Sequence, residues 1–473
     1  MTHMHRSPSD ALILLVLLAA AGLRLYVYGD PRLSVGYTDT SSYVRSAAAP
    51  LFSWEMFAGE RPFTTNLVYK LAADPERCLL IAVSRPRSGV KFNRGIQPCF
   101  DRIALLQNAL SVLAWSFLAW AVSRGLRHPA LRVVGAALVV LFAFTPQIAE
   151  WDYLLSPESL TLSLFALVFA LAWTLCTRAF RAPNLEGGSR YLWALTAAWL
   201  AAYFLWVFVR DVHLYTLVPT TLLVLFIPAS KDFRRSRLAL VLGALLGAIF
   251  LLGCRSARDS LRASIEPLRN AFETYIFPYP QRVAYMESLG MPVHGSAVFQ
   301  DWFDANATGA YGLYLASHPG FVLATLGENA AYFKAGFEQP YFRTRDIRWR
   351  RILLELGRLL HPETLAVYVF DGLILLLLLL GAARLREPPL LAWTWLALWA
   401  FACAVVTLLP AFFGDTVGIG RHIFPSVEMF RLYLWVSLLV LIDRGVAGIT
   451  LRDTVAISSR DGAARLHGDR VEG

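Results

Sequence analysis

The chain has 473 residues, of which 56% are hydrophobic and only 16% are charged, and its formal net charge at pH 7 is +10. Soluble globular proteins carry about a quarter charged residues, so this composition excludes an ordinary soluble domain and is typical of a membrane protein. The positive charge lies largely in short loops between apolar runs, with no basic-aromatic stripe, so we expect no nucleic-acid partner.

Ten apolar runs alternate with polar segments along the chain. A bilayer core about 30 Å thick takes about 20 helical residues to cross, and every backbone polar group inside it must be bonded internally. We therefore predict an all-α polytopic membrane protein with about ten transmembrane helices. The predicted spans are 11–29, 103–123, 133–149, 159–177, 191–209, 214–229, 238–254, 366–383, 390–409 and 430–443.

The loops set the orientation and the domain organisation. The first run continues into further spans, so we interpret it as an uncleaved helix rather than a signal peptide. Alternate short loops are rich in Lys and Arg, which places them and both termini in the cytoplasm. Two large loops, 30–102 and 255–364, then lie on the extracytoplasmic side of a plasma (cell inner) membrane. Residues 1–445 form this membrane domain, and 446–473 form a polar cytoplasmic tail that we expect to be disordered.

The first large loop opens with Thr38-Asp39-Thr40-Ser41-Ser42-Tyr43. If this segment is helical, Asp39 and Tyr43 share one face at i, i+4. A carboxylate at a membrane surface is partly desolvated and can serve as a general base. The alternative is that Asp39 is an ordinary helix N-cap.

Further along this loop, Arg61 and Lys70 could bind a phosphate, or could form a basic surface beside anionic lipid headgroups. Cys78 and Cys99 also fall in this loop. An extracytoplasmic location permits a disulfide between them, but the sequence leaves the pairing open.

The short outer loop after the third span is unusually acidic. Glu150, Asp152 and Glu158 fall within nine residues of a chain that is otherwise apolar. Ser156 followed by Pro157 is a typical N-cap and first helical residue, and this ordinary interpretation also explains Glu158 in the first turn. It does not explain Asp152, which we therefore take as a second candidate catalytic carboxylate.

Cations also stand at outer ends of later spans. Arg210 and His213 follow the fifth span, and Arg421 and His422 precede the tenth. Such cations run against the positive-inside bias, so we expect them to bind an anion. The alternative is a surface ion pair, for example between Arg210 and the adjacent Asp211, which would contribute little.

Together these residues predict one outer-face site that transfers a group from a lipid-linked phosphate donor. A carboxylate would deprotonate an acceptor hydroxyl, and cations would stabilise the charge that develops on the leaving phosphate. The carboxylates could also hold one divalent cation through oxygen ligands, but no ligand spacing demands it, so we assign no cofactor.

These motifs resemble those of the GT-C superfamily of membrane glycosyltransferases, which includes protein O-mannosyltransferases, aminoarabinose transferases and arabinofuranosyltransferases. The resemblance rests on the layout of the chain and on short motifs: 39–43, 59–62 with 67–71, Asp152 or Glu150, and 156–160. The first two groups carry an Asp-Glu pair in the first loop, whereas Thr40 follows Asp39 here.

The resemblance implies that Asp39 is the catalytic base, that Asp152 is the second acidic residue, and that the reaction inverts the anomeric centre. The donor would be a polyprenyl-phosphate hexose or pentose, and the acceptor a glycan, lipid or protein hydroxyl. The implied substrate-binding residues are Tyr43, Arg61, Lys70, Glu158, Arg210, His213, Arg421 and His422.

Two other functions remain open at this point. One is an O-antigen-type ligase or polymerase, although such enzymes concentrate their key residues in a late loop. The other is a lipid or solute transporter, for which Asp371 inside the eighth span is the supporting residue, because an ionisable group within a span usually has a function. Transporters often contain internal repeats, and we find none in this sequence.

Overall fold

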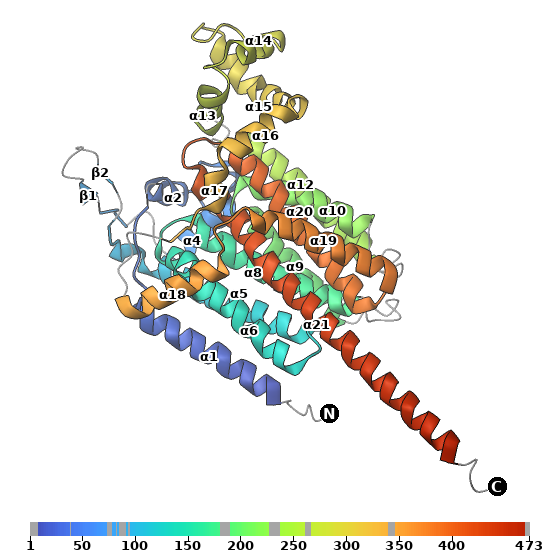
Figure 1. Ribbon diagram of the computed structural model, residues 1–473. Coiled ribbons are helices and arrows are strands. Elements are labelled where there is room, and N and C mark those ends of the chain that lie inside the picture. The colour runs from blue at the N-terminus through green and yellow to red at the C-terminus, as the bar shows by residue number, and fades with distance from the viewer. Residues whose placement is uncertain are drawn as a thin grey trace.

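Helices make up almost all of the regular structure of this protein. The computed structural model describes residues 8–37, 39–72, 78–81, 83–84, 91–92, 95–179, 190–226, 237–260, 266–338 and 346–468. Within these residues the long helices lie side by side in one bundle, and shorter helices gather at one end of it (Figure 1). The predicted all-α fold class is confirmed.

Seven helices in the described part of the chain are long and apolar enough to cross a membrane. They are α1 (Pro8–Tyr28), α5 (Asp101–Gly125), α8 (Pro157–Ala179), α12 (Arg237–Asp259), α19 (Ala366–Leu385), α20 (Pro388–Phe413) and α21 (Ile419–Gly468). A further candidate is bent: α6 (Pro129–Phe144) turns by 50° into α7 (Pro146–Ala149) and the 3-10 helix η2 (Glu150–Tyr153), and the two parts together are long and apolar enough for an eighth, broken span. Pro146 has no N–H with which to continue the helix, which accounts for the break.

The two remaining predicted spans are also helical. They correspond to α9 (Arg190–Val207) and to the 3-10 helix η3 (Asp211–Thr216) followed by α10 (Leu217–Leu225). The second of them is short, and α9 is rich in Trp and Tyr, so neither reaches the length and apolarity of the others. Their crossing of the membrane, and hence the total of ten spans, stays a prediction.

The last helix begins much earlier than the sequence predicts. We expected a span over 430–443, but α21 starts at Ile419. Its first turns carry Arg421, Glu428 and Arg431, which are typical of a loop when they are seen in sequence alone. In the structure these side chains are paired with acidic or basic partners, so they fit inside a helix. The helix also continues to Gly468, through most of the tail that we expected to be disordered.

Both large loops contain short helices at the same end of the bundle (Figure 1). The first holds α2 (Thr40–Ser46), α3 (Trp54–Ala58), α4 (Phe63–Ala72), the antiparallel pair β1 (Val83–Ser84) and β2 (Lys91–Phe92), and the 3-10 helix η1 (Pro98–Phe100). The second holds α13 (Glu266–Tyr275), α14 (Pro280–Ser288), α15 (Phe299–Ser317), α16 (Pro319–Glu328), α17 (Ala330–Lys334) and α18 (Ile347–Leu360).

Helices α13 to α16 project from the bundle, and we call them the outer arm (Figure 1). The start of α1 and the end of α21 lie at the opposite end of the bundle from the arm. This arrangement agrees with the alternation of predicted spans, which puts both termini on one side and both large loops on the other.

Several ionisable residues are buried among the helices. Arg24 on α1 pairs with Asp152, and both side chains are almost fully buried. A second group, which we call the buried network, consists of His361, Glu428 and Arg431. In the first large loop Cys78 and Cys99 form a disulfide, so the pairing that the sequence left open is present.

Candidate active site

The polar segment after the first span forms the short helix α2. Asp39, directly before this helix, contacts a residue near the end of the sequence, Arg421. Asp39 precedes α2, but its side chain makes no capping hydrogen bond. Its carboxylate instead accepts a hydrogen bond from Nη1 of Arg421, with Oδ2 at 2.5 Å. Thr40 Oγ1 donates to the carbonyl of Leu155 at 2.9 Å, which fixes α2 beside the start of α8. The predicted base is therefore held at the end of the bundle that carries both large loops (Figure 1).

Arg421 joins three separate parts of the chain. Its Nη2 donates to the hydroxyl of Tyr43 at 2.9 Å, and its Nε donates to Oε1 of Glu158 at 2.7 Å. The guanidinium also lies over the ring of Tyr37, 4.6 Å from its centre. Asp39 and Tyr43 thus face the same cation, as their predicted i, i+4 spacing requires.

Glu158 stands between two arginines. It lies in the first turn of α8, its side chain is fully buried, and Oε1 is 3.5 Å from Nη2 of Arg210 as well as hydrogen-bonded to Arg421. A buried carboxylate is stable only when it is paired, and here two guanidiniums share that role. Arg210 therefore pairs with the buried Glu158 and is not confined to a surface pair with its neighbour Asp211.

Arg210 also contacts His422. Its Nη2 lies 3.3 Å from Nδ1 of His422, and its Nη1 donates to the backbone carbonyl of the same residue at 3.4 Å. Nε2 of His422 faces Oδ2 of Asp415 at 3.4 Å. We call the set Asp39, Tyr43, Glu158, Arg210, Arg421 and His422 the outer cluster.

Arg61 lies at the edge of the outer cluster. Its Nε donates to Oγ of Ser42 at 2.8 Å, and its guanidinium covers the ring of Tyr43 at 4.5 Å from the centre. Desolvation by burial raises the pKa of Tyr43 above its usual value, although the charges of Arg421 and Arg61 oppose the rise. The Tyr43 hydroxyl therefore stays protonated at neutral pH and remains available as a hydrogen-bond donor.

Three predicted site residues lie outside this cluster. Lys70 Nζ donates to the carbonyl of Ala48 at 3.1 Å. His213 is buried, stacks on Trp206 with ring centres 4.6 Å apart, and bonds the carbonyl of Trp206 through Nδ1 at 2.8 Å. These contacts do not test the predicted binding roles of Lys70 and His213, which stay predictions.

Asp152, the second predicted catalytic residue, is the third. It is buried, paired with Arg24, and accepts a hydrogen bond from Ser159. Asn108 donates to its backbone carbonyl at 3.3 Å and accepts from Arg24 at 2.8 Å. A carboxylate that is enclosed by its own partners cannot reach an acceptor hydroxyl. The geometry favours a structural role for Asp152. Its hydrogen bond from Ser159, the residue after Glu158, stabilises the start of α8.

Sequence reasoning missed three residues that matter for this arrangement. Arg24 is a cation inside an apolar run, which is itself a signal that a buried partner exists. Tyr37 lies just before the acidic motif, and Asp415 stands six residues before Arg421 in a short polar turn. A search for acids near the predicted cations could have found Asp415.

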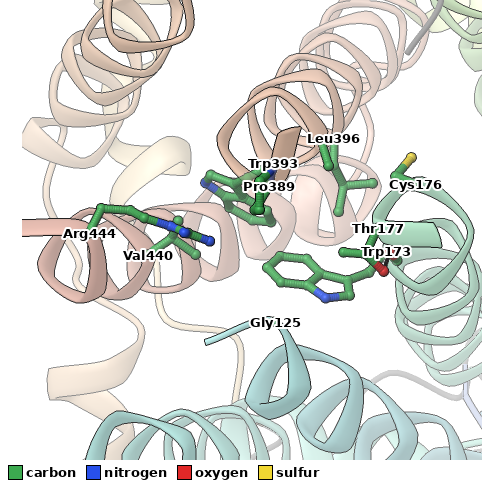
Figure 2. A pocket seen from close by; sticks show the side chains of 10 residues that line it. Gly125, Trp173, Cys176, Thr177, Pro389, Trp393, Leu396, Val440 and Arg444 are labelled. Atoms are coloured by element: carbon green, nitrogen blue, oxygen red, sulfur yellow. Dashed lines mark hydrogen bonds between the residues drawn. The ribbon is translucent and has the colours of Figure 1, made fainter. Parts of the chain in front are cut away.

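No group of three or more His, Cys, Asp or Glu side chains in the described residues is arranged to hold a metal ion. The two carboxylates of the outer cluster instead share Arg421. A hollow elsewhere in the bundle is lined by Trp173, Trp393 and Arg444, among others (Figure 2). Arg444 and Arg421 lie on the same helix, about 34 Å apart at its usual rise per residue, so this hollow is not part of the outer cluster.

No protein-family model and no curated protein matches the chain. Two solved structures from Archaeoglobus fulgidus are similar to it: the oligosaccharyltransferase in its apo form (12% identity, TM-score 0.43, 96% of this chain covered) and the oligosaccharyltransferase AglB in complex with an inhibitory peptide and a dolichol-phosphate (13%, 0.43, 93%). The chain spans about half the length of each, 53% and 52% respectively.

Proposed function

We propose that this protein is a membrane glycosyltransferase that moves a sugar from a polyprenyl-phosphate donor to an acceptor hydroxyl on the extracytoplasmic face. One observation carries the proposal: Asp39, an acidic residue of the first large loop, accepts a hydrogen bond from Arg421, and Glu158 links Arg421 to a second cation, Arg210, in a partly open cluster. A base and a set of phosphate-binding groups are what such a transfer requires.

In this proposal Asp39 is the general base. Its side chain is 36% exposed, so an acceptor hydroxyl can approach it. Asp39 takes the proton of that hydroxyl while the acceptor oxygen attacks the anomeric carbon. The bond between this carbon and the phosphate oxygen breaks, and the polyprenyl phosphate leaves with the bonding electron pair. A single displacement by one base inverts the anomeric centre.

Arg421, Arg210 and Arg61 stabilise the charge that develops on the leaving phosphate. Guanidinium groups bind phosphate through paired hydrogen bonds, which makes them suited to this task. A donor phosphate would compete with Asp39 for Nη1 of Arg421. Binding of the donor then frees the carboxylate of Asp39 for the acceptor, while Glu158 keeps Arg421 in place.

The surroundings agree with this assignment. The polyprenyl chain would lie among the apolar helices, with its phosphate at the outer cluster. The disulfide between Cys78 and Cys99 is typical of an oxidising compartment, which supports an extracytoplasmic location for the first loop in a plasma (cell inner) membrane. The acceptor is a glycan, lipid or protein hydroxyl, and the sugar is a hexose or pentose.

The test is a transfer assay with purified protein in lipid nanodiscs. A panel of radiolabelled polyprenyl-phosphate sugars is supplied, and release of polyprenyl phosphate is measured with Asp39→Asn and with Asp30→Asn as the matched control in the same loop. We expect Asp39→Asn to lower turnover by about 10²- to 10⁴-fold, as loss of a general base does, and Asp30→Asn to stay within about twofold. Equal turnover of both variants would remove the proposed role of Asp39.

One observation favours a transporter as a second candidate. Asp371 on α19 is fully buried, and neither of its carboxylate oxygens has a hydrogen-bond partner in the described part of the chain. A lipid-translocation assay in proteoliposomes separates the two functions. Transport predicts that Asp371→Asn blocks movement and Asp39→Asn does not, whereas the transferase predicts that Asp39→Asn alone abolishes sugar transfer.

A further inference from the structure

The turn between α20 and α21 leads directly into the outer cluster. Gly418 adopts φ +75°, which glycine tolerates, and its carbonyl accepts the backbone N–H groups of Arg421 and His422 at 2.9 and 3.3 Å. Asp415 stabilises the same turn, because its Oδ1 accepts the backbone N–H of Val417 at 2.9 Å. The conformation of this turn therefore determines the positions of Arg421 and His422 at the start of α21.

The protonation pattern of His422 follows from its partners. A guanidinium can only donate, so the contact of Arg210 Nη2 with Nδ1 requires that Nδ1 accept. The proton of the neutral ring then lies on Nε2, which faces Oδ2 of Asp415 at 3.4 Å. A carboxylate beside one ring nitrogen favours the tautomer in which that nitrogen carries the proton and the other nitrogen accepts. Asp415 and Arg210 thus demand the same tautomer.

The outer arm holds Asp415 from the other side. Asn270 on α13 donates through Nδ2 to Oδ1 of Asp415 at 3.1 Å. Thr416 Oγ1 donates to the backbone carbonyl of Asn270 at 2.9 Å, so in its 2.8 Å contact with Thr274 Oγ1 the Thr274 hydroxyl is the donor. Asp415 is therefore fixed by the arm on one oxygen and faces His422 with the other.

We propose that Asp415 is a positioning residue that, anchored by the outer arm, fixes His422 as the Nε2-protonated tautomer and so aligns Arg210 beside Glu158. The inference rests on the proposed function for its effect on catalysis but not for its effect on His422. Without Asp415, Arg210 loses an oriented acceptor, and its distance from Glu158, 3.5 Å here, is no longer constrained from the His422 side.

The first measurement needs no substrate. Solid-state NMR of ¹⁵N-histidine-labelled protein in lipid bilayers distinguishes a protonated from an unprotonated ring nitrogen, and His422→Gln identifies the His422 signals. We expect an unprotonated Nδ1 and a protonated Nε2 in the wild type. We expect that pattern to be lost in Asp415→Asn, whose amide can present N–H donors to the ring. A wild-type His422 protonated on Nδ1, or an unchanged spectrum in Asp415→Asn, would overturn the proposal.

The second measurement is kinetic. Loss of an oriented hydrogen bond to a charged group corresponds to about a tenfold effect. We expect Asp415→Asn to lower kcat about tenfold with a smaller change in donor KM, and Asp301→Asn, an exposed acid on the arm, to have no effect. Thr416→Val should lower kcat less, and Thr416→Ser, which keeps the hydroxyl, should restore it. Unchanged kcat in Asp415→Asn would refute the positioning role.

The two proposals fail separately. If no donor is consumed by the wild type but the NMR pattern is present and is lost in Asp415→Asn, the proposed function fails and the tautomer assignment stands. If transfer occurs and depends on Asp39 while His422 shows the other tautomer, the positioning role fails and the proposed function stands.

Discussion

The outer cluster and the buried network share three residue types, Glu, Arg and His, but differ in their exposure to solvent. Each contains a glutamate held by an arginine, together with a histidine, and each draws on α21. In the buried network every side chain is about 1% exposed, and Glu428 is bonded by His361 on one oxygen and by Arg431 on the other. In the outer cluster Asp39 is 36% and His422 is 29% exposed. Composition alone therefore does not identify a site, but access to ligand does.

The two groups also differ in whether other protein groups satisfy the hydrogen bonding of their side chains. His361 is bonded through Nε2 to Thr145 and to the carbonyl of Phe142, and Arg431 donates to the carbonyl of Ala335. These groups are satisfied by the protein and join α18 and α21 to the broken span. Arg421, by contrast, holds a carboxylate that a substrate phosphate could replace. We infer that the buried network serves folding and the outer cluster serves chemistry.

The largest expected effect tests the folding half of this comparison. Arg431→Leu leaves Glu428 buried with only His361 as a partner, and breaking a buried ion pair costs about 3–5 kcal/mol. We expect a strong loss of folded protein, measured as the yield of monodisperse material and its thermal midpoint in detergent. Normal yield and midpoint would show that the network is not needed for the fold.

Arg421→Leu tests the other half and should have the next largest effect. Removal of one donor that stabilises developing charge costs about 2.7–4 kcal/mol of transition-state stabilisation. Turnover should fall about 10²- to 10³-fold while the protein remains folded, because Glu158 keeps a permanently charged partner, Arg210, whereas Glu428 in Arg431→Leu keeps only a histidine. Arg358→Leu, which removes an exposed arginine paired with Glu355, is the matched control and should retain turnover. A turnover of Arg421→Leu close to that of this control would remove Arg421 from the site.

The disulfide offers a prediction of intermediate size. Cys78 and Cys99 close a loop with a sequence separation of 21, and such a cross-link contributes about 3 kcal/mol in the chain-entropy model. The loop that the disulfide closes belongs to the same large loop as α2. We therefore expect Cys78→Ser to increase the amide hydrogen-exchange rates of residues 39–46 and to lower turnover. The helices around the buried network should be unaffected in the same hydrogen-exchange experiment. Equal acceleration in both regions would show that the two are not independent.

The sequence predicted the helices well because long apolar runs have few alternatives in a membrane protein. It misplaced the start of α21 because Arg421, Glu428 and Arg431 are polar, and their partners lie far away in the chain. The pairing of Arg421 with Asp39 joins residues 382 positions apart, which no local pattern reveals. Asp39 and Tyr43 could be linked because helical periodicity alone puts them on one face.

The prediction for Asp152 illustrates the same limit. The density of acids between 150 and 158 drew attention to it, but its environment depends on Arg24, 128 positions earlier. His213 was expected to bind an anion for its place at a span end, yet it bonds the carbonyl of Trp206. Local composition can predict that a segment is polar, whereas the partner that decides between structure and function comes from the fold.

Tyr43→Phe gives the smallest effect and the sharpest view of the outer cluster. Arg421 loses one of its three hydrogen-bond partners and keeps Asp39 and Glu158, so we expect turnover to fall about tenfold, as for one hydrogen bond to a charged group. Burial raises the pKa of Tyr43, so its hydroxyl is protonated in both the folded and the unfolded chain below about pH 10. Above that pH the unfolded chain ionises first, and stability falls as the pH rises. The ratio of wild-type to Tyr43→Phe turnover should therefore be constant from pH 6 to about pH 9. A ratio that changes within this range would mean that Tyr43 takes part in proton transfer, and the base would then be a pair formed by Asp39 and Tyr43 rather than Asp39 alone.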